Sequence, residues 1–175
     1  MKETLLMYAR YTQRANADVV ALLDKLPIEA LNEDRKSYYR SLSGLATHTM
    51  GGAAYFHRLF RAAAPQAARA LKATEGLSCP EGDKLTAAQW ADVKRVVAAA
   101  DKATVEFVEA ANEAELSAPV KIDWYGGRPD AVPLAFLLHA SFVHGTHHRG
   151  QISQVLDSMG VEHDFSGLDL EFFPK

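Results

Sequence analysis

Cysteine is almost missing from this chain of 175 residues, because Cys79 is the only one. A single thiol cannot form an internal disulfide, which is typical of proteins from a reducing compartment. Cys79 lies between Gly76 and Gly82 in a segment that we expect to be a loop. A nucleophilic role would require a base beside it, and the sequence shows none. We therefore interpret Cys79 as an ordinary loop thiol.

An excess of positive charge is also missing, since 19 Lys and Arg face 22 Asp and Glu, for a net charge of −3. Nucleic-acid binders normally carry a basic excess, so we expect no nucleic-acid partner. No segment approaches the ~18 consecutive apolar residues of a membrane span. The start of the chain, with Glu3, lacks the uninterrupted apolar stretch of a signal peptide. These absences predict a cytoplasmic protein that does not contact a membrane.

A segment with the composition of an inter-domain linker is also missing, because no Gly/Ser-rich or Pro-rich stretch divides the chain. Its length suits one domain, and its 48% of hydrophobic residues are enough for one core. We expect a single domain over residues 1–175.

Four long segments carry apolar residues at steps of three and four, as one face of an α-helix does. Pro27 and Pro65 follow the first two segments and stop a helix there. Thr86 and Gln89 form a capping-box pattern before the third, and Gly160 suits the end of the fourth. Four helices of similar length predict an all-α four-helix bundle. The expected ranges are 2–26, 43–64, 87–111 and 133–159.

The connections between these helices differ in length. Residues 65–85 are many for a helix–helix connection, whereas residues 27–40 leave room for one short helical turn. Alternating residues on both sides of Gly126-Gly127 permit a small hairpin before the last helix. Apolar residues in the tail, within Leu168–Phe173, are expected to pack on the bundle.

Histidine is concentrated near the end of the chain, where His139, His144, His147 and His148 fall within ten residues. At ~100° per residue, His144 and His148 lie on one helix face, four residues apart, and can share a small ion. His147 projects roughly 100° away from His148, and His139 is nearly opposite it. We interpret His139 as structural or exposed, and His147 as a residue beside a ligand or at a pocket rim.

His48 lies at the flank of the apolar stripe of the second helix, where it can face a flank of a neighbouring helix. It could supply a third ligand to the pair formed by His144 and His148. Three neutral imidazoles leave open positions on a divalent ion. We expect one ion per chain, with zinc or nickel favoured over iron, cobalt or manganese. Flank histidines also often bond only to neighbouring polar groups, so a structural role stays open.

Four further residues have alternative interpretations. Gln151 could orient a ligand or a molecule bound to the metal. Tyr55, on the face of His48 two turns later, could line a pocket or pack in the core. Arg149 is interpreted as part of an inter-helix salt bridge rather than as an anion site. Asn16 could face the metal site or satisfy a backbone group.

Three motifs together resemble those of DinB-like (DinB/YfiT) proteins. His144-Gly-Thr-His-His148-Arg-Gly-Gln151-Ile resembles the signature near the end of that family, and Leu45-Ala-Thr-His48-Thr-Met resembles its second-helix motif. Tyr11-Thr-Gln-Arg14-Ala-Asn16 is similar to the first helix, although Arg14 stands where a tryptophan is common. The closing segment Leu168–Phe173 also fits, so the resemblance covers nearly the whole chain.

The resemblance implies a bundle with up-down-down-up topology, a long crossover between the second and third helices, and a metal held by His48, His144 and His148. It also implies a homodimer, because many members form one. Characterised relatives include thiol-dependent transferases and isomerases and a few metal-dependent hydrolases.

We therefore hypothesise a metal-dependent enzyme that activates a small thiol or water for attack on a small electrophile, with its catalytic base unidentified. The alternatives are a metal-binding or ligand-binding protein of a stress response, and a structural dimer whose histidines cluster by accident.

Overall fold

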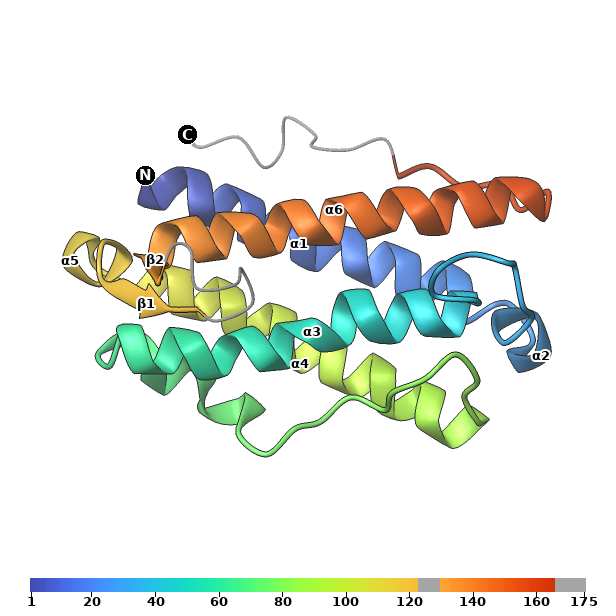
Figure 1. The fold of residues 1–175 in the computed structure, drawn as a ribbon, viewed down its shortest axis with the longest axis horizontal. Helices are drawn as coiled ribbons and strands as arrows, with labels where there is room; N and C mark the ends of the chain where they lie inside the picture. The colour runs from blue at the N-terminus through green and yellow to red at the C-terminus, as the bar shows by residue number, and fades with distance from the viewer. Residues whose placement is uncertain (123–129, 166–175) are drawn as a thin grey trace.

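Long helices packed side by side dominate the computed structural model, which describes residues 1–122 and 130–165 (Figure 1). Two short helices, α2 (Ile28–Leu31) and α5 (Glu113–Leu116), lie in the connections. This architecture confirms the predicted helical bundle. The long helices are α1 (Lys2–Leu23), α3 (Leu42–Ala63), α4 (Ala87–Ala110) and α6 (Leu134–Ser158).

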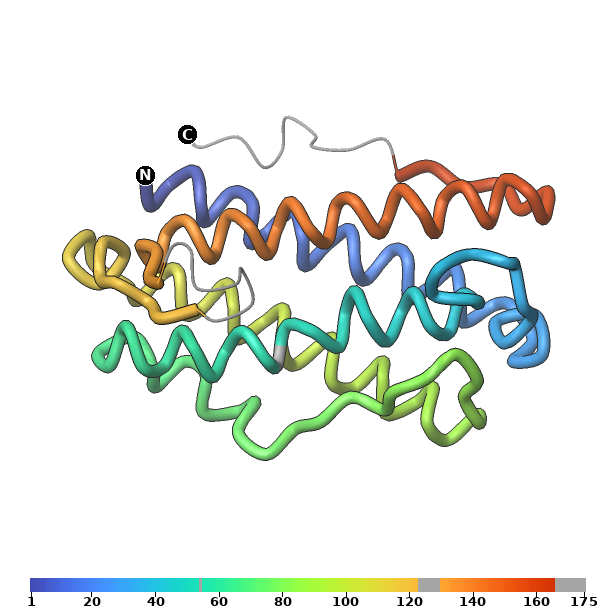
Figure 2. Tube along the Cα trace, viewed as in Figure 1, coloured from blue at the N-terminus to red at the C-terminus, as the bar shows by residue number. Residues whose placement is uncertain are grey.

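The long helices follow an up-down-down-up order, which the colour gradient along the chain shows (Figure 2). α3 runs opposite to α1, α4 runs parallel to α3, and α6 returns parallel to α1. Each packs against two others, in the ring order α1, α4, α3 and α6. The metal-site histidines therefore come from two helices that are neighbours, α3 and α6.

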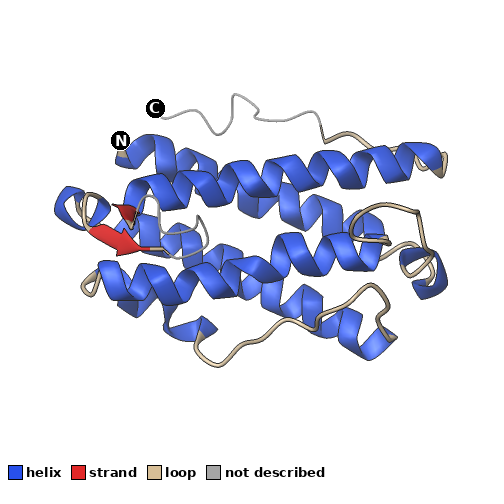
Figure 3. Cartoon of the chain, viewed as in Figure 1, coloured by secondary structure: helices blue, strands red, loops and turns tan. Residues whose placement is uncertain are grey.

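The crossover between α3 and α4 must travel the length of the bundle, because these two helices are parallel. It begins with a 3₁₀ helix, η1 (Ala67–Thr74), which packs against α4 and α3. Ala67 and Leu71 of η1 are buried. The crossover then continues as an irregular chain along the outside of the bundle (Figure 3), as the family resemblance implied.

Local capping chemistry sets several helix ends where the sequence placed them. The Ser41 side chain accepts a hydrogen bond from the backbone N–H of Gly44 at 3.0 Å. Thr86 and Gln89 form the complete capping box of α4. Gly160 follows α6 with φ of 69°, a left-handed conformation that glycine adopts without strain. The caps at Thr86 and Gly160 confirm the corresponding sequence predictions.

The end of α1 differs from its prediction, because the helix stops at Leu23 rather than at residue 26. The next residue, Asp24, accepts hydrogen bonds from Trp90 Nε1 at 3.0 Å and Lys94 Nζ at 2.6 Å, both on α4. A looser turn then leads into Pro27, which directly precedes α2. The expected helical turn after Pro27 is therefore present.

A small hairpin precedes α6, as the sequence permitted. β1 (Pro119–Lys121) pairs antiparallel with β2 (Ala131–Pro133), and Val120 lies opposite Val132. Both valines are buried, so the hairpin closes one end of the core. The expected turn at Gly126-Gly127 and the tail motif Leu168–Phe173 lie outside the described residues.

The apolar core is divided into two clusters along the bundle. One contains Phe60, Phe107 and Leu138 near the hairpin end, and the other contains Leu23, Met50 and Ile152 near the α2 end. Along each long helix, buried polar residues fall between the two clusters: Asn16 on α1, His57 on α3, Asp101 on α4, and His148 and Arg149 on α6. None of the helices in the described ranges is long and apolar enough to cross a bilayer.

Candidate metal centre

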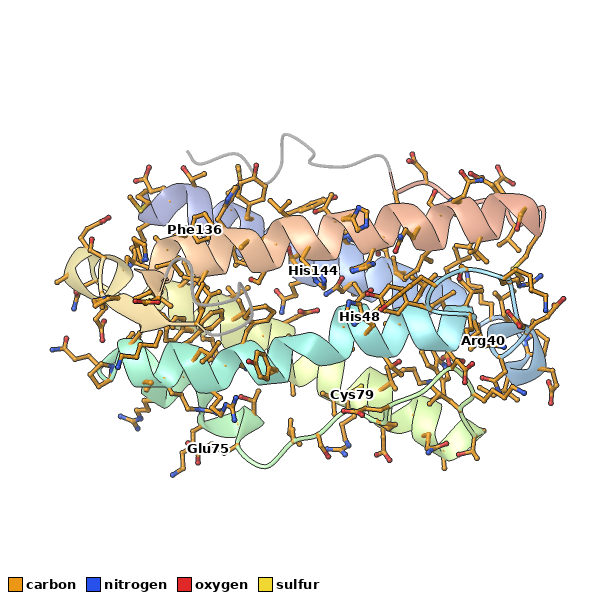
Figure 4. The ribbon with its side chains drawn as sticks, in the orientation of Figure 1. Arg40, His48, Glu75, Cys79, Phe136 and His144 are labelled. Carbon is orange, nitrogen blue, oxygen red and sulfur yellow. The ribbon has the colours of Figure 1, made fainter. Side chains whose placement is uncertain are left out.

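Three imidazole rings meet between α3 and α6. His48 faces His144 across the two helices (Figure 4), with their Nε2 atoms 3.3 Å apart. His148, one turn after His144, places its Nε2 at 3.0 Å from that of His144. The three possible ligand atoms lie within 4.8 Å of one another. The structure thus brings together the three histidines that the sequence singled out.

These distances suit one shared ion. Metal–imidazole bonds of about 2.0–2.1 Å place two nitrogen atoms roughly 3.3 Å apart at a tetrahedral angle and roughly 2.9 Å apart at a right angle. Burial, with smaller effects of the nearby imidazoles, lowers the pKa of His144 to about 4. Burial also lowers the pKa of His148 and of His48. All three rings are therefore neutral at pH 7, which is the form that binds a metal.

Gln151 fixes the ring of His148. Its Oε1 lies 2.6 Å from Nδ1 of His148. Because an amide oxygen can only accept a hydrogen bond, Nδ1 carries the proton and Nε2 keeps its lone pair. That lone pair is directed at the other two imidazoles. The expectation that Gln151 orients a ligand agrees with this contact.

Tyr39 is part of the site, and sequence reasoning missed it. Its hydroxyl lies 2.8 Å from Nε2 of His48, and its ring stacks on the His48 ring at 4.2 Å. Burial, and then the neighbouring Tyr38, raise the pKa of Tyr39, so its hydroxyl keeps its proton at neutral pH. Tyr39 precedes α3 in a connection without periodicity, and the Tyr38-Tyr39 pair before the cap residue was the only signal.

A groove of about 690 Å³ opens from His48 across the outer face of α3 to the crossover. Tyr55 lines it and is 45% exposed, with the Arg58 guanidinium 5.1 Å from the centre of its ring. This volume lies within the range of small-molecule sites. The remaining wall comes from the crossover, through residues 77–83.

Cys79 stands in that wall and packs against α3 at Gly51. Burial, with smaller effects of Glu81 and Asp92, raises the pKa of the Cys79 thiol to about 11. The thiol therefore stays protonated at neutral pH and is a poor nucleophile. This agrees with its interpretation as an ordinary loop thiol.

The other histidines have separate surroundings. His147 is exposed, with its ring 4.9 Å from that of His148, and does not belong to the group of three. His139 is exposed beside Tyr8. His163 bonds to Ser153 and to a backbone carbonyl. His139 is thus exposed as expected, and His147 lies beside the candidate ligand His148 but not among the residues that line the groove described above.

Arg149 and Asn16 belong to the buried polar residues rather than to the groove. Arg149 reaches from α6 to α1, but it donates to Oδ1 of Asn16 at 3.0 Å instead of to a carboxylate. Asn16 in turn donates to both carboxylate oxygens of Asp101, at 3.2 and 3.0 Å. The expected direct salt bridge of Arg149 is thus replaced by a bridge through an amide, and the sequence did not identify Asp101.

A bundle of four long helices with three convergent histidines defines the class: helical-bundle proteins with a candidate three-histidine metal centre. The chain belongs to the DinB family, whose model matches residues 1–169. Comparisons with curated proteins and with solved structures gave no match. The family match confirms the resemblance of the sequence motifs and assigns no particular reaction.

Proposed function

We propose that this protein is a metal-dependent enzyme that activates a small thiol or water for attack on a small electrophile. The convergence of three neutral Nε2 atoms beside a groove of about 690 Å³ is the observation that carries this proposal. One divalent ion, zinc or nickel first, would be held by His48, His144 and His148. Such an ion supplies Lewis acidity, which lowers the pKa of a thiol or water bound to it. The family resemblance favours the thiol.

The surrounding residues position the ligands and the substrate. Gln151 holds His148 in the tautomer with a free Nε2. Tyr39 stacks on His48 and bonds to the nitrogen that would bind the ion. Once that nitrogen is occupied, the Tyr39 hydroxyl can donate to a molecule in the groove. Tyr55 and Arg58 offer an aromatic surface and a positive charge further along it.

Metal content tests the site directly. Native protein should contain about one divalent ion per chain, and His148→Ala should lose it, because the two remaining imidazoles bind weakly. His147→Ala is the matched control and should keep the ion, since His147 lies outside the group of three. Equal metal content in native protein and His148→Ala, measured by plasma mass spectrometry, would contradict the proposal.

Turnover separates an enzyme from a binding protein. Metal-loaded protein should consume bacillithiol, mycothiol or glutathione together with an electrophile, or hydrolyse an ester or amide. Tight binding of one of these compounds without turnover would instead favour a metal-binding or ligand-binding role in a stress response.

We also propose that the protein forms a homodimer through an outer face of the bundle. Phe136 and Val143, two turns apart on α6, are each 51% exposed, and Figure 4 shows Phe136 on the outside of the helix. Apolar residues on one exposed helix face support such an interface. A monomeric mass in light scattering would contradict it.

A further inference from the structure

A chain of buried polar side chains crosses the centre of the bundle from α6 to α4. Arg149, next to the candidate ligand His148, donates to Asn16, and Asn16 donates to Asp101. Asp101 is only 7% exposed. Arg149 also donates to Thr146 at 3.0 Å and lies over the Tyr11 ring. The neutral amide of Asn16 therefore separates the positive charge of Arg149 from the negative charge of Asp101. In this chain of hydrogen bonds, Asp101 does not contact Arg149 directly.

An internal cavity of about 50 Å³ lies between this chain and the metal centre. His144 and Asp101 both line it, together with the hydroxyl residues Thr12, Thr49 and Ser141 and with apolar side chains such as Phe56 and Phe142. The hydroxyls of Thr12 and Thr49 are buried and have no hydrogen-bond partner among the described residues. A polar cavity of this size has room for about three water molecules, which would satisfy both hydroxyls.

The candidate ligands themselves cannot take a proton from a bound nucleophile. Each would use its Nε2 for the ion, and Nδ1 of His148 already donates to Gln151. A nucleophile that becomes an anion therefore needs another base. Among the groups that line the cavity, Asp101 is the carboxylate, and the cavity connects it to the side of His144.

We propose that this cavity is a hydrated proton path and that Asp101 is the internal proton acceptor of the metal centre. The inference rests on the function proposed above. In the step, the S–H or O–H bond of the nucleophile breaks, its electron pair stays on sulfur or oxygen, and the proton passes along the waters. A carboxylate O–H bond forms on Asp101. Reversal of the path returns the proton, so no other reactant is consumed.

The charged and titratable groups around Asp101 are consistent with this role. They are His57 from α3, and His144 and Arg149 from α6, while α1 contributes the neutral Asn16. Burial raises the pKa of Asp101 to about 7, although the bond from Asn16 and the charge of Arg149 oppose the shift. A carboxyl group with such a pKa both accepts and releases protons near neutral pH.

Carbon-13 NMR of zinc-loaded protein labelled at aspartate Cγ tests the acceptor without any substrate. The signal that Asp101→Asn removes should titrate with a midpoint near 7. Asp101→Asn keeps an oxygen that accepts from Asn16 and should retain zinc. A midpoint in the ordinary range around 3.9 would overturn the proposal.

Calorimetry of 2-mercaptoethanol binding to zinc-loaded protein, in buffers of different ionisation enthalpy, tests the path. Asp101→Asn should release about one proton per thiol bound, whereas native protein should release clearly less, because Asp101 retains part of that proton. Thr49→Val removes a cavity hydroxyl and keeps the carboxylate, so it should leave the proton count as in native protein but slow deprotonation of the bound thiol in stopped-flow measurements. This tests the path even if Asp101→Asn does not fold.

Equal release by native protein and Asp101→Asn would overturn Asp101 as the acceptor, and an unchanged deprotonation rate in Thr49→Val would overturn the path. Both outcomes would leave the proposed function intact. Zinc-loaded protein that binds no thiol would overturn both the path and thiol activation.

Discussion

At the scale of single residues, Gln151 controls how well the site holds a metal. Its bond to Nδ1 of His148 fixes the ring and its tautomer. Gln151→Leu should weaken metal binding about 10–100-fold, as the loss of such supporting contacts commonly does. Competition with a chromophoric chelator measures the affinity. Gln154→Leu, the same change at an exposed position on α6, should have no effect; equal affinities for the two variants would contradict the role of Gln151.

His57 is held in one tautomer by a directed series of hydrogen bonds. Arg61 donates to Thr74 Oγ1 at 2.8 Å and to the Leu71 carbonyl at 2.6 Å. The Thr74 hydroxyl lies 2.8 Å from that carbonyl and 3.0 Å from His57 Nδ1, and a neutral ring accepts its proton at Nδ1 while Arg61 still satisfies the carbonyl. His57 Nε2–H then donates to Thr104, whose hydroxyl donates to the carbonyl of Ala100. Every member is satisfied when the imidazole is neutral. Burial, and then the charge of Arg61, lower its pKa to about 4.

His57 and Asp101 should give the folded protein opposite pH dependences. As the pH falls from 6.5 to about 4, His57 binds a proton in the unfolded chain but not in the folded protein. This lowers the free energy of unfolding. As the pH falls from about 7 to 3.8, Asp101 of the folded protein binds a proton that the unfolded chain does not bind. This raises the free energy of unfolding. Each slope is about 1.4 kcal/mol per pH unit.

Relative to native protein, His57→Gln should therefore gain stability on acidification and Asp101→Asn should lose it. Urea unfolding of metal-free protein between these pH values measures both, and curves parallel to that of native protein would contradict the shifts.

The sequence predicted site residues only where helical geometry relates them. His144 and His148 are four residues apart on one helix, so a spacing argument suffices. Tyr39 and Asp101 reach their positions through a loop and through the packing of α4 against α1 and α3. A single sequence carries no periodic signal for such contacts.

At the scale of elements, two adjacent glycines of α3 should respond oppositely to alanine. A Cβ at Gly51 would lie 2.7 Å from Cβ and 2.8 Å from Sγ of Cys79, so the crossover would have to move. A Cβ at Gly52 meets nothing within 4 Å. Gly52→Ala should stabilise the protein by about 0.5–1 kcal/mol, as alanine does within a helix.

Gly51→Ala should lose more than that gain, because the clash involves a β-carbon that cannot rotate away. Thermal unfolding of the two variants side by side measures the difference, and equal stabilisation by both would show that the crossover does not pack tightly on α3.

Helix ends were predictable where they depend on neighbouring residues in the sequence. Ser41, Thr86 and Gly160 act through local caps, and the structure has all three. The predicted end of α1 was wrong by three residues, because Asp24 accepts hydrogen bonds from Trp90 and Lys94. Both residues belong to α4, far along the chain. Local rules contain no information about that contact.

At the scale of the whole molecule, a bound ion would join α3 to α6 and should stabilise the fold. Free metal at about 100 times its dissociation constant adds about 2.7 kcal/mol to the free energy of unfolding. The thermal midpoint of native protein should therefore rise on addition of zinc and fall back with a chelator. His48→Ala should abolish the rise, whereas His147→Ala should keep it; a rise that persists in His48→Ala would contradict a shared ion.

The four periodic segments were enough to predict a helical bundle. They did not predict how the four helices are arranged in space. A connection of the length of residues 64–86 also fits other arrangements, and the parallel pairing of α3 and α4 came from the family resemblance. The two core clusters and the polar residues between them depend on all four helices at once. They could not be derived from any one segment.

The crossover lines the groove separately from the helices that carry the candidate ligands. The candidate ligands belong to α3 and α6, whereas the far wall of the groove is an irregular strand of chain that contributes no ligand. Side chains of residues 77–83 that face the groove can therefore be exchanged without replacing a candidate ligand. Substitutions in this one exterior segment can change which compounds the groove accepts. The segment is therefore the natural place for a library in directed evolution.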